Sequence, residues 1–133
     1  MAVGRVDRDE TTAKFFDGTS RGDFLLRHCA DCATFSQPQA EQCSHCNSRA
    51  LNWETARGYA LLVTWTVVHS KPRDGVTEQM VLGVAQLEEG PWWWSQVNGA
   101  DPHSLYEGAP LKIEFEKTGD EGEYVPVFRL REE

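Results

Sequence analysis

Two short cysteine turns decide how the first half of this chain folds: CADC at positions 29–32 and CSHC at positions 43–46. Each turn holds two thiols separated by two residues, and ten residues lie between the turns. Two pairs at this spacing can present four sulfur atoms to one tetrahedral ion. The pattern predicts a structural zinc, in preference to disulfides, a redox pair or a four-thiolate iron centre, with the ligands Cys29, Cys32, Cys43 and Cys46.

The segment that carries the cysteines is polar. Between Cys29 and Asn52 it is rich in Ser, Asn and Gln and has few large aliphatic side chains, so it cannot build an apolar core of its own. We expect metal binding to supply its folding energy. His45 lies inside the second turn, but four thiolates already complete the shell, and we expect its side chain at the surface.

The residue after each pair's second cysteine decides the shape of its turn. Turns of this kind commonly carry glycine there, because the backbone needs a positive φ. This chain has Ala33 and Asn47 instead. Asn tolerates that conformation whereas Ala does not, so we expect an altered first turn.

The second half of the chain has the pattern of β-structure. Its clearest strand is YALLVTWTVVH at 59–69, which is dense in β-branched and aromatic residues and alternates apolar with polar positions. Two further strands follow, QMVLGVAQL at 79–87 and WWWSQV at 92–97. Gly83 lies inside the second of these, where we expect a bulge or tight bend.

A helical turn and two more strands complete the pattern. Asp101 at a cap position followed by Pro102 predicts one turn of helix. Residues 111–116 then alternate apolar with charged side chains, and YVPVFRL at 124–130 forms the last strand, with Pro126 at an edge or bulged position. Five strands with this helical insert predict a mainly β fold built on a five-stranded Greek-key barrel of the OB type.

A brief helix is expected before the cysteines. Thr11 or Thr12 can cap it, and the turn signal DGTS at 17–20 ends it. It carries Phe15 and Phe16, which are more apolar surface than so short a helix can bury alone. They pack either on this chain's own barrel or on a partner subunit, and the sequence leaves both possibilities open.

Three consecutive tryptophans occupy one predicted strand. Because successive strand residues face opposite sides, at least one of Trp92, Trp93 and Trp94 points outward. An outward Trp is either shielded by a neighbouring loop or anchors an interface, and we favour the interface because Trp is enriched at binding hot spots. Trp65, which lies between two threonines in an earlier strand, is expected in the core.

The composition argues against several classes of function. The net charge of −8 repels nucleic acid unless positive charge is concentrated locally, and the basic residues form no run. No apolar stretch is long enough to span a membrane, and the N-terminus lacks a hydrophobic signal core. We therefore expect a soluble cytoplasmic protein, where reducing conditions favour a metal over disulfides.

The sequence also holds no evident catalytic set. It has no nucleophile elbow, no phosphate-binding glycine loop and no metal ligands with an open position. His69 and His103, the only loosely suggestive bases, are expected to be structural. We expect no independent catalysis.

The order and spacing of these features resemble one known family, the "domain of unknown function 35" proteins. The resemblance runs over nearly the whole chain. Its carriers are Phe15, Phe16, Gly18, Gly22, the four cysteines, Gly58, Thr66-Val67-Val68-His69, Leu87-Glu88-Glu89-Gly90, Gly108-Ala109-Pro110, Phe115, Pro126 and Phe128. The resemblance implies an N-terminal helical segment at 1–23, a rubredoxin-like zinc ribbon at 24–54 and an OB-fold barrel at 55–133.

The resemblance also implies a function. Such proteins bind thiolase-superfamily enzymes that act on acyl-CoA thioesters, including thiolases, acyltransferases and the lipid-transfer-protein-like aldolases that cleave steroid side chains. This chain is then expected to be a non-catalytic subunit in a hetero-oligomer, helping to form the partner's acyl-CoA site. Its three tryptophans are bulkier than the aliphatic residues expected on that strand. Candidate partner-interface residues are Phe15, Phe16, Trp92, Trp93 and Trp94, and candidate CoA-phosphate residues are Lys71 and Arg73.

Two alternatives remain. Zinc ribbons and OB barrels both commonly bind nucleic acids, so a free-standing nucleic-acid-binding protein is the second hypothesis; the acidic charge weighs against it. A third is an enzyme that handles acyl-CoA by itself, for which no catalytic set is present.

Overall fold

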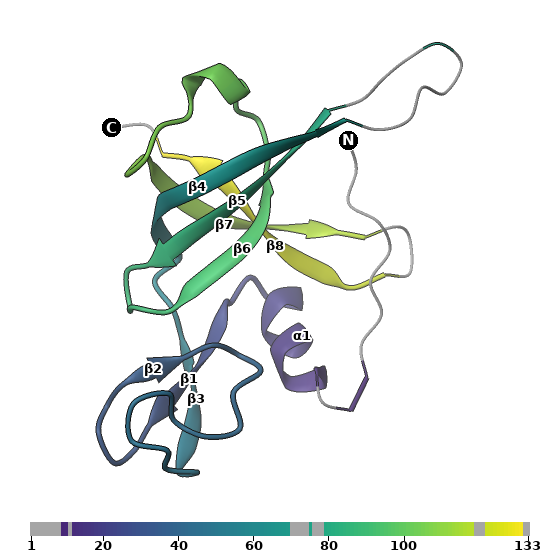
Figure 1. Ribbon diagram of the computed structural model, residues 1–133. Helices are drawn as coiled ribbons and strands as arrows, with labels where there is room; N and C mark the ends of the chain where they lie inside the picture. The colour runs from purple at the N-terminus through teal and green to yellow at the C-terminus, as the bar shows by residue number, and fades with distance from the viewer. Residues whose placement is uncertain (1–8, 11, 70–74, 76–78, 119–121, 132–133) are drawn as a thin grey trace.

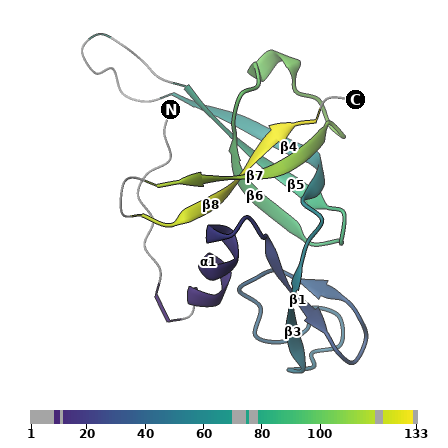
Figure 2. The same ribbon diagram turned by 180° about the vertical axis from the view of Figure 1, so that it is seen from behind.

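The computed structural model describes residues 9–10, 12–69, 75, 79–118 and 122–131. It confirms the expected class: the fold is mainly β, with one short α-helix. A small three-stranded sheet and helix α1 lie side by side beneath a closed barrel (Figures 1 and 2). The elements of the lower part are α1 (Ala13–Ser20), β1 (Leu25–Cys29), β2 (Phe35–Ser36) and β3 (Leu51–Thr55).

The barrel has the strand order β4-β5-β6-β8-β7 and closes through the pairing of β4 with β7. The alternating sequences form strands where expected, because one side of each strand faces the barrel interior. The helical turn η1 (Pro102–Ser104) stands between the third and fourth barrel strands, and the Asp101 carboxylate caps it by accepting from the His103 amide. The barrel strands are β4 (Tyr59–His69), β5 (Gln79–Leu87), β6 (Trp92–Val97), β7 (Pro110–Lys117) and β8 (Tyr124–Leu130).

One seam of the barrel has a short ladder, which the Ser95 hydroxyl of β6 extends by donating to the Pro126 carbonyl of β8. Strands β6 and β8 run parallel and pair only at Val97 and Phe128, while every other neighbouring pair of barrel strands shares a longer ladder. Pro126, which lacks an N–H for a ladder, lies in β8 opposite Phe115 of β7, on the strand that borders this seam. The position agrees with the edge placement expected for this proline.

The core continues from the barrel into the base of the molecule. Leu62, Leu111 and Phe128 are fully buried inside the barrel, and Phe24 and Leu26 join the same cluster from the lower part. Trp65 is only half-buried, although it packs against the core as expected. No helix in the described part of the chain is long and apolar enough to cross a membrane.

Helix α1 is longer than predicted. The expected stop at 17–20 is wrong, because the helix continues to Ser20. Gly18 is needed inside it, since a Cβ there would come within 2.7 Å of the Leu25 side chain. The chain leaves the helix at Gly22, whose φ is +86°, and the Asp23 amide donates to the Gly18 carbonyl at 2.9 Å. This is the bonding of a glycine-terminated helix end.

The cap of α1 also differs from the expected one. Thr12 occupies the N-cap position, but its hydroxyl makes no bond to the helix. It bonds instead to Asp9, accepting from the Asp9 amide at 2.9 Å and donating to the Asp9 carboxylate at 3.1 Å. Thr11 lies outside the described residues.

The bulge expected at Gly83 is elsewhere. Gly83 pairs regularly with Trp65, and the register of β4 against β5 shifts between Leu62 and Thr64. Gly83 is required for packing: a Cβ there would lie 2.8 Å from Val97 Cγ2 and 3.1 Å from Leu62 Cδ1. The glycine therefore makes room for two large side chains in the barrel interior.

Candidate functional site

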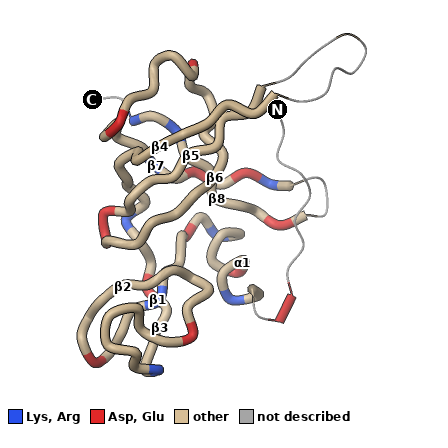
Figure 3. The backbone as a smooth tube through the Cα atoms, in the orientation of Figure 1, with Lys and Arg blue, Asp and Glu red and all other residues tan. Residues whose placement is uncertain are grey.

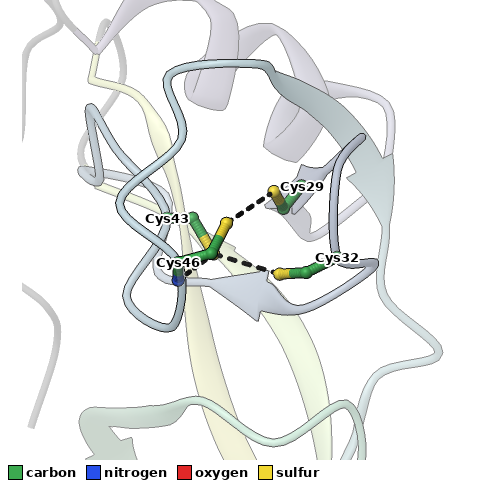
Figure 4. A group of neighbouring side chains, drawn as sticks. All are labelled: Cys29, Cys32, Cys43 and Cys46. Carbon is green, nitrogen blue, oxygen red and sulfur yellow. Dashed lines mark hydrogen bonds between the residues drawn. The ribbon is translucent and has the colours of Figure 1, made fainter.

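The four cysteines meet at one point of the lower sheet (Figure 4). The first pair follows β1 and the second lies in the long loop before β3. Their sulfur atoms all lie within 4.8 Å of one another, and two contacts are shorter: Cys29 Sγ to Cys46 Sγ is 3.6 Å, and Cys32 Sγ to Cys43 Sγ is 3.5 Å. Cys29 and Cys43 are buried, so the cluster is closed on its inner side.

The spacing of the sulfur atoms fits a tetrahedral metal ion. Four metal–sulfur bonds of about 2.3 Å place the sulfurs about 3.8 Å apart. All four cysteines are free, and no sulfur atom approaches another to bonding distance. The predicted convergence of the four cysteines is therefore confirmed, and their clustering indicates a candidate metal site.

The two cysteine turns have the same geometry. The Ala33 amide donates to the Cys29 carbonyl at 2.9 Å, and the Asn47 amide donates to the Cys43 carbonyl at 3.0 Å. Ala33 has φ = 64° and Asn47 has φ = 62°. The expectation of an altered first turn is wrong: Ala33 accepts the left-handed conformation because the turn must aim both thiols at one point.

Backbone amides and the neighbouring sulfurs set the electrostatics of the cluster. The Cys46 and His45 amides point at Cys43 Sγ from 3.5 and 3.4 Å and lower the pKa of that thiol. At Cys46 the Ser48 amide lowers the pKa, but burial of the sulfur and the three other thiols outweigh it and raise the pKa to about 12. The residue is otherwise exposed, yet its sulfur points into the cluster (Figure 4). A cation that binds here must displace protons.

The tryptophans of β6 alternate as predicted. Trp92 and Trp94 point outward and are 51% and 68% exposed. Trp93 points inward, where its ring packs perpendicular to Phe24 at a centroid distance of 5.2 Å and tilted against Phe15 at 5.9 Å. Two tryptophans of the three are thus free for contacts with another molecule.

Phe15 and Phe16 pack within this chain. They are 8% and 7% exposed, and they belong to the hydrophobic core cluster. Phe15 contacts Phe24 edge-to-face at 5.7 Å. The sequence left open whether these rings pack on this chain or on a partner. Most of their surface is buried within this chain.

The outer side of β4, β5 and β6 forms a continuous surface without charge, called the neutral face below. The three strands contain no Lys, Arg, Asp or Glu at any position (Figure 3). Strand register places its side chains in rows: Leu61, Gln86 and Trp92; Thr64, Val84 and Trp94; Thr66, Leu82 and Gln96; and Val68 with Met80. Of the six exposed large hydrophobic residues in the described chain, four lie on this face: Leu61, Val68, Trp92 and Trp94.

A groove of about 1120 Å³ adjoins the neutral face, between α1, the lower sheet and the β6–β8 seam of the barrel. Its walls are mostly apolar and include Phe15, Phe16, Trp53, Trp93, Trp94 and Val125. Arg27 of β1 also lines it, with its guanidinium 4.5 Å above the Trp53 ring. The sequence analysis missed Arg27, because one basic residue in a strand has no distinguishing neighbour in the sequence.

The CoA-phosphate candidates cannot be placed against these features. Lys71 and Arg73 both lie outside the described residues. The described basic side chains are scattered over the molecule (Figure 3).

Comparison with known proteins identifies relatives. A family model described as "ChsH2, C-terminal OB-fold domain" matches residues 53–116. The 3-oxo-4,17-pregnadiene-20-carboxyl-CoA hydratase alpha subunit of Mycobacterium tuberculosis is 25% identical over 114 residues, which are 86% of this chain and 36% of that protein. A DUF35 domain-containing scaffold protein of Pyrococcus furiosus is 29% identical over 77 residues, 57% of each chain. This chain thus matches about a third of the first relative and just over half of the second.

Two solved structures share the fold. A chain of the "Ltp2-ChsH2(DUF35) aldolase" superposes with a TM-score of 0.78 at 24% identity, covering 95% of this chain and 98% of that one. A DUF35-family protein of unknown function from Sulfolobus solfataricus superposes with a TM-score of 0.62 at 13% identity, covering 92% and 86%. The family model, the DUF35-named relatives and the shared fold all support the resemblance of this chain to DUF35 proteins.

Proposed function

We propose that this chain is a non-catalytic accessory subunit that binds a thiolase-superfamily partner and helps form the partner's acyl-CoA site. The partner is a thiolase, an acyltransferase or an aldolase that cleaves steroid side chains. The observation that carries the proposal is the neutral face, with Trp92 and Trp94 exposed at its edge. A surface of this kind is unusual on a monomeric protein and typical of a protein interface.

The charge distribution supports a protein partner. About a quarter of all residues are charged (26%), yet the outer side of three adjacent barrel strands has no charged side chain. A partner that covers this face would desolvate no ion there, so the apolar contacts would contribute to affinity without an electrostatic penalty.

The names of the relatives agree with an accessory role. One relative is the alpha subunit of a hydratase that acts on a CoA ester, another is a scaffold protein, and the chain of highest structural similarity described above comes from an aldolase. From these names we infer that this chain also associates with an enzyme. We further infer that the substrates of this enzyme are CoA thioesters.

The cysteine cluster has a structural part in the proposal. Zinc fits its four-thiolate set and the spacing of its sulfurs. When bound, the ion would cross-link the two turns and hold the lower sheet in shape. Because four protein ligands leave no position for water or substrate, the zinc would take no part in a reaction.

The names of the relatives support a non-catalytic role, because they are a subunit of a hydratase, a chain of an aldolase and a scaffold protein. We therefore assign the reaction to the partner.

The negative charge of CoA indicates which subunit contacts its phosphates. CoA carries several phosphate charges, and this chain carries −8, so the partner would supply most of the phosphate contacts. Lys71 and Arg73 remain the proposed contribution of this chain. The same charge argument disfavours the nucleic-acid hypothesis, since the neutral face offers aromatic rings but no cations to pair with a phosphate backbone.

Co-expression with a thiolase-superfamily protein from the same genome tests the proposal. The wild-type chain should co-elute with the partner on size exclusion as a hetero-oligomer. The double variant Trp92→Ser/Trp94→Ser should elute separately, whereas Tyr106→Ser, which removes an aromatic ring of similar exposure (56%) outside the neutral face, should still co-elute. A wild-type chain that always elutes as a monomer would contradict the proposal.

A further inference from the structure

The loop between the two cysteine turns is bonded to the barrel. The Gln37 side chain donates from Nε2 to the Trp92 carbonyl at 2.7 Å, although 55 positions of sequence separate the two residues. Among the described residues, no other hydrogen bond joins residues 29–52 to the barrel strands. Trp92 is the first residue of β6 and belongs to the neutral face. One side chain of the cysteine segment is thus attached to the strand that carries the exposed Trp92 and Trp94.

The cysteine cluster fixes the position of this loop. Ser36, which precedes Gln37, is buried, and its hydroxyl accepts from the Ser44 amide at 3.2 Å and lies 3.1 Å from the Ser44 hydroxyl. Ser44 follows Cys43, whose sulfur belongs to the cluster. Residues 38–42 form neither helix nor strand, so their placement depends on these ties at the two ends of the loop.

The loop continues the uncharged surface of the neutral face. Its sequence at 37–42 is QPQAEQ, in which Glu41 is the one charged residue. Residues 38–41 line the same groove as Trp94. A molecule that covers Trp92 and Trp94 would therefore also meet this loop.

We propose that residues 37–42 are a second part of the partner interface, which the bound metal holds beside Trp92, so that metal loading raises the affinity for the partner. This inference rests on the proposed function, because it requires the partner. Gln37 is a positioning residue: its bond to Trp92 sets where the loop lies relative to the neutral face. Because binding free energies are reciprocal, the partner must raise the affinity for the metal by the same factor.

The charge of the chain favours the partner over a second copy as the occupant of this surface. A second copy would bring another net charge of −8 toward the first. A partner of different net charge can cover the loop and the neutral face without that repulsion, and depletion of charge is typical of the centre of an interface.

Two variants of the full-length, metal-loaded chain test the role of Gln37, with the co-expressed thiolase-superfamily protein as the probe. Gln37→Ala removes the donor to Trp92 and should weaken partner binding about threefold to tenfold by calorimetry, since a lost hydrogen bond has an effect of that size. The control is Asn52→Ala, which removes an exposed amide from β3 on the side opposite Trp53 and the groove. It should bind like the wild type. Elemental analysis should find the same metal content in both variants, and equal binding of the two would contradict the role of Gln37.

Hydrogen exchange tests the loop itself. The Glu41 and Gln42 amides donate to no acceptor among the described residues, so they should exchange rapidly in the free chain and slowly in the complex. If the partner binds without slowing them, the loop lies outside the interface, and this inference is wrong while the accessory role stands. A free chain that elutes as a dimer in which the same amides are slowed would assign the surface to a second copy instead.

Competition with EDTA tests the coupling to the metal. The partner should raise the EDTA concentration that removes half of the metal from the wild type, and it should raise it less for Gln37→Ala. An unchanged concentration in a complex that does form would show that metal loading and partner binding are independent. A wild type that binds no partner would overturn the proposed function and this inference with it.

Discussion

Cys32 Sγ lies 3.5 Å from Cys43 Sγ, although eleven positions separate the two residues in the sequence. The segment between them has one large apolar side chain, Phe35, which packs against the core, so the proposed ion would be its main cross-link. Elemental analysis should find about one zinc per chain, and Cys43→Ser should lose the metal and most protection from hydrogen exchange between residues 29 and 52. The control is His45→Ala, which should keep both, because His45 is exposed and outside the ligand set.

The cysteine turns show what sequence reasoning could reach. Spacing alone predicted the meeting of four sulfurs, because the geometry of a tetrahedral site is the same in every protein. The prediction for the Ala33 turn was wrong. The backbone preference of alanine disfavours a positive φ, but Ala33 adopts one because the turn must bring both cysteine side chains to the cluster. The local rule was outweighed by an interaction between residues far apart in the chain.

Ala33→Gly should therefore stabilise the metal-loaded protein. Ala in the left-handed region costs about 1–2 kcal/mol, and glycine removes that cost while losing about 0.5–1 kcal/mol through its greater freedom when unfolded. The expected net gain is about 0.5–1 kcal/mol in urea unfolding. Ala30→Gly, in the same turn but without a positive φ, should lower stability instead. Equal effects of the two substitutions would show that Ala33 is unstrained.

The barrel strands were predictable because each has a buried side, and alternation is the direct consequence of burial. The end of helix α1 and the role of Gly83 were not predictable. A glycine in the sequence usually indicates a turn, but Gly18 and Gly83 are needed here because side chains of other elements pack closely against them. The groove could not be anticipated either, because it depends on how α1, the lower sheet and the barrel seam meet, which no local pattern encodes.

Gly83→Ala should destabilise the barrel. The added methyl would lie 2.8 Å from Val97 Cγ2, closer than real carbon contacts allow, so the interior must shift. Overpacking of this kind costs about 1–3 kcal/mol, measurable as a lower urea midpoint at unchanged slope. Adding Val97→Ala should recover part of the loss relative to the sum of the two single changes. Strict additivity would mean that the methyl and Val97 do not compete for the same space.

The ion pairs of Glu114 predict a small effect of pH on the free energy of unfolding. Its pKa is lowered by the Arg129 guanidinium, whose Nε lies 2.6 Å away, and further by Lys112 at 3.4 Å. A carboxyl whose pKa is lower in the folded state stabilises the fold above its unfolded pKa and loses that contribution as pH falls through the folded value. Because these side chains are about 40% exposed (39% and 43%), Glu114→Gln should cost under about 1 kcal/mol at pH 7. The difference from wild type should vanish near pH 2 in urea titrations, and a difference that persists there would assign the effect to packing. Glu107→Gln, in an exposed loop, is the matched control.

The aromatic residues should separate stability from binding. Phe15 is 8% exposed and contacts Phe24 and Trp93, so it ties α1 to the barrel, whereas Trp94 is 68% exposed. Phe15→Leu should lower the free energy of unfolding by about 1–2 kcal/mol, because a shape change in a packed site leaves part of the space unfilled. Trp94→Ser should change it by less than about 0.5 kcal/mol, as surface substitutions do, yet it should weaken partner binding. Urea unfolding of the free chain and calorimetry with the partner measure the two quantities. If Trp94→Ser destabilised the free chain as much as Phe15→Leu, its ring would be part of the fold, and the neutral face would lose its best anchor.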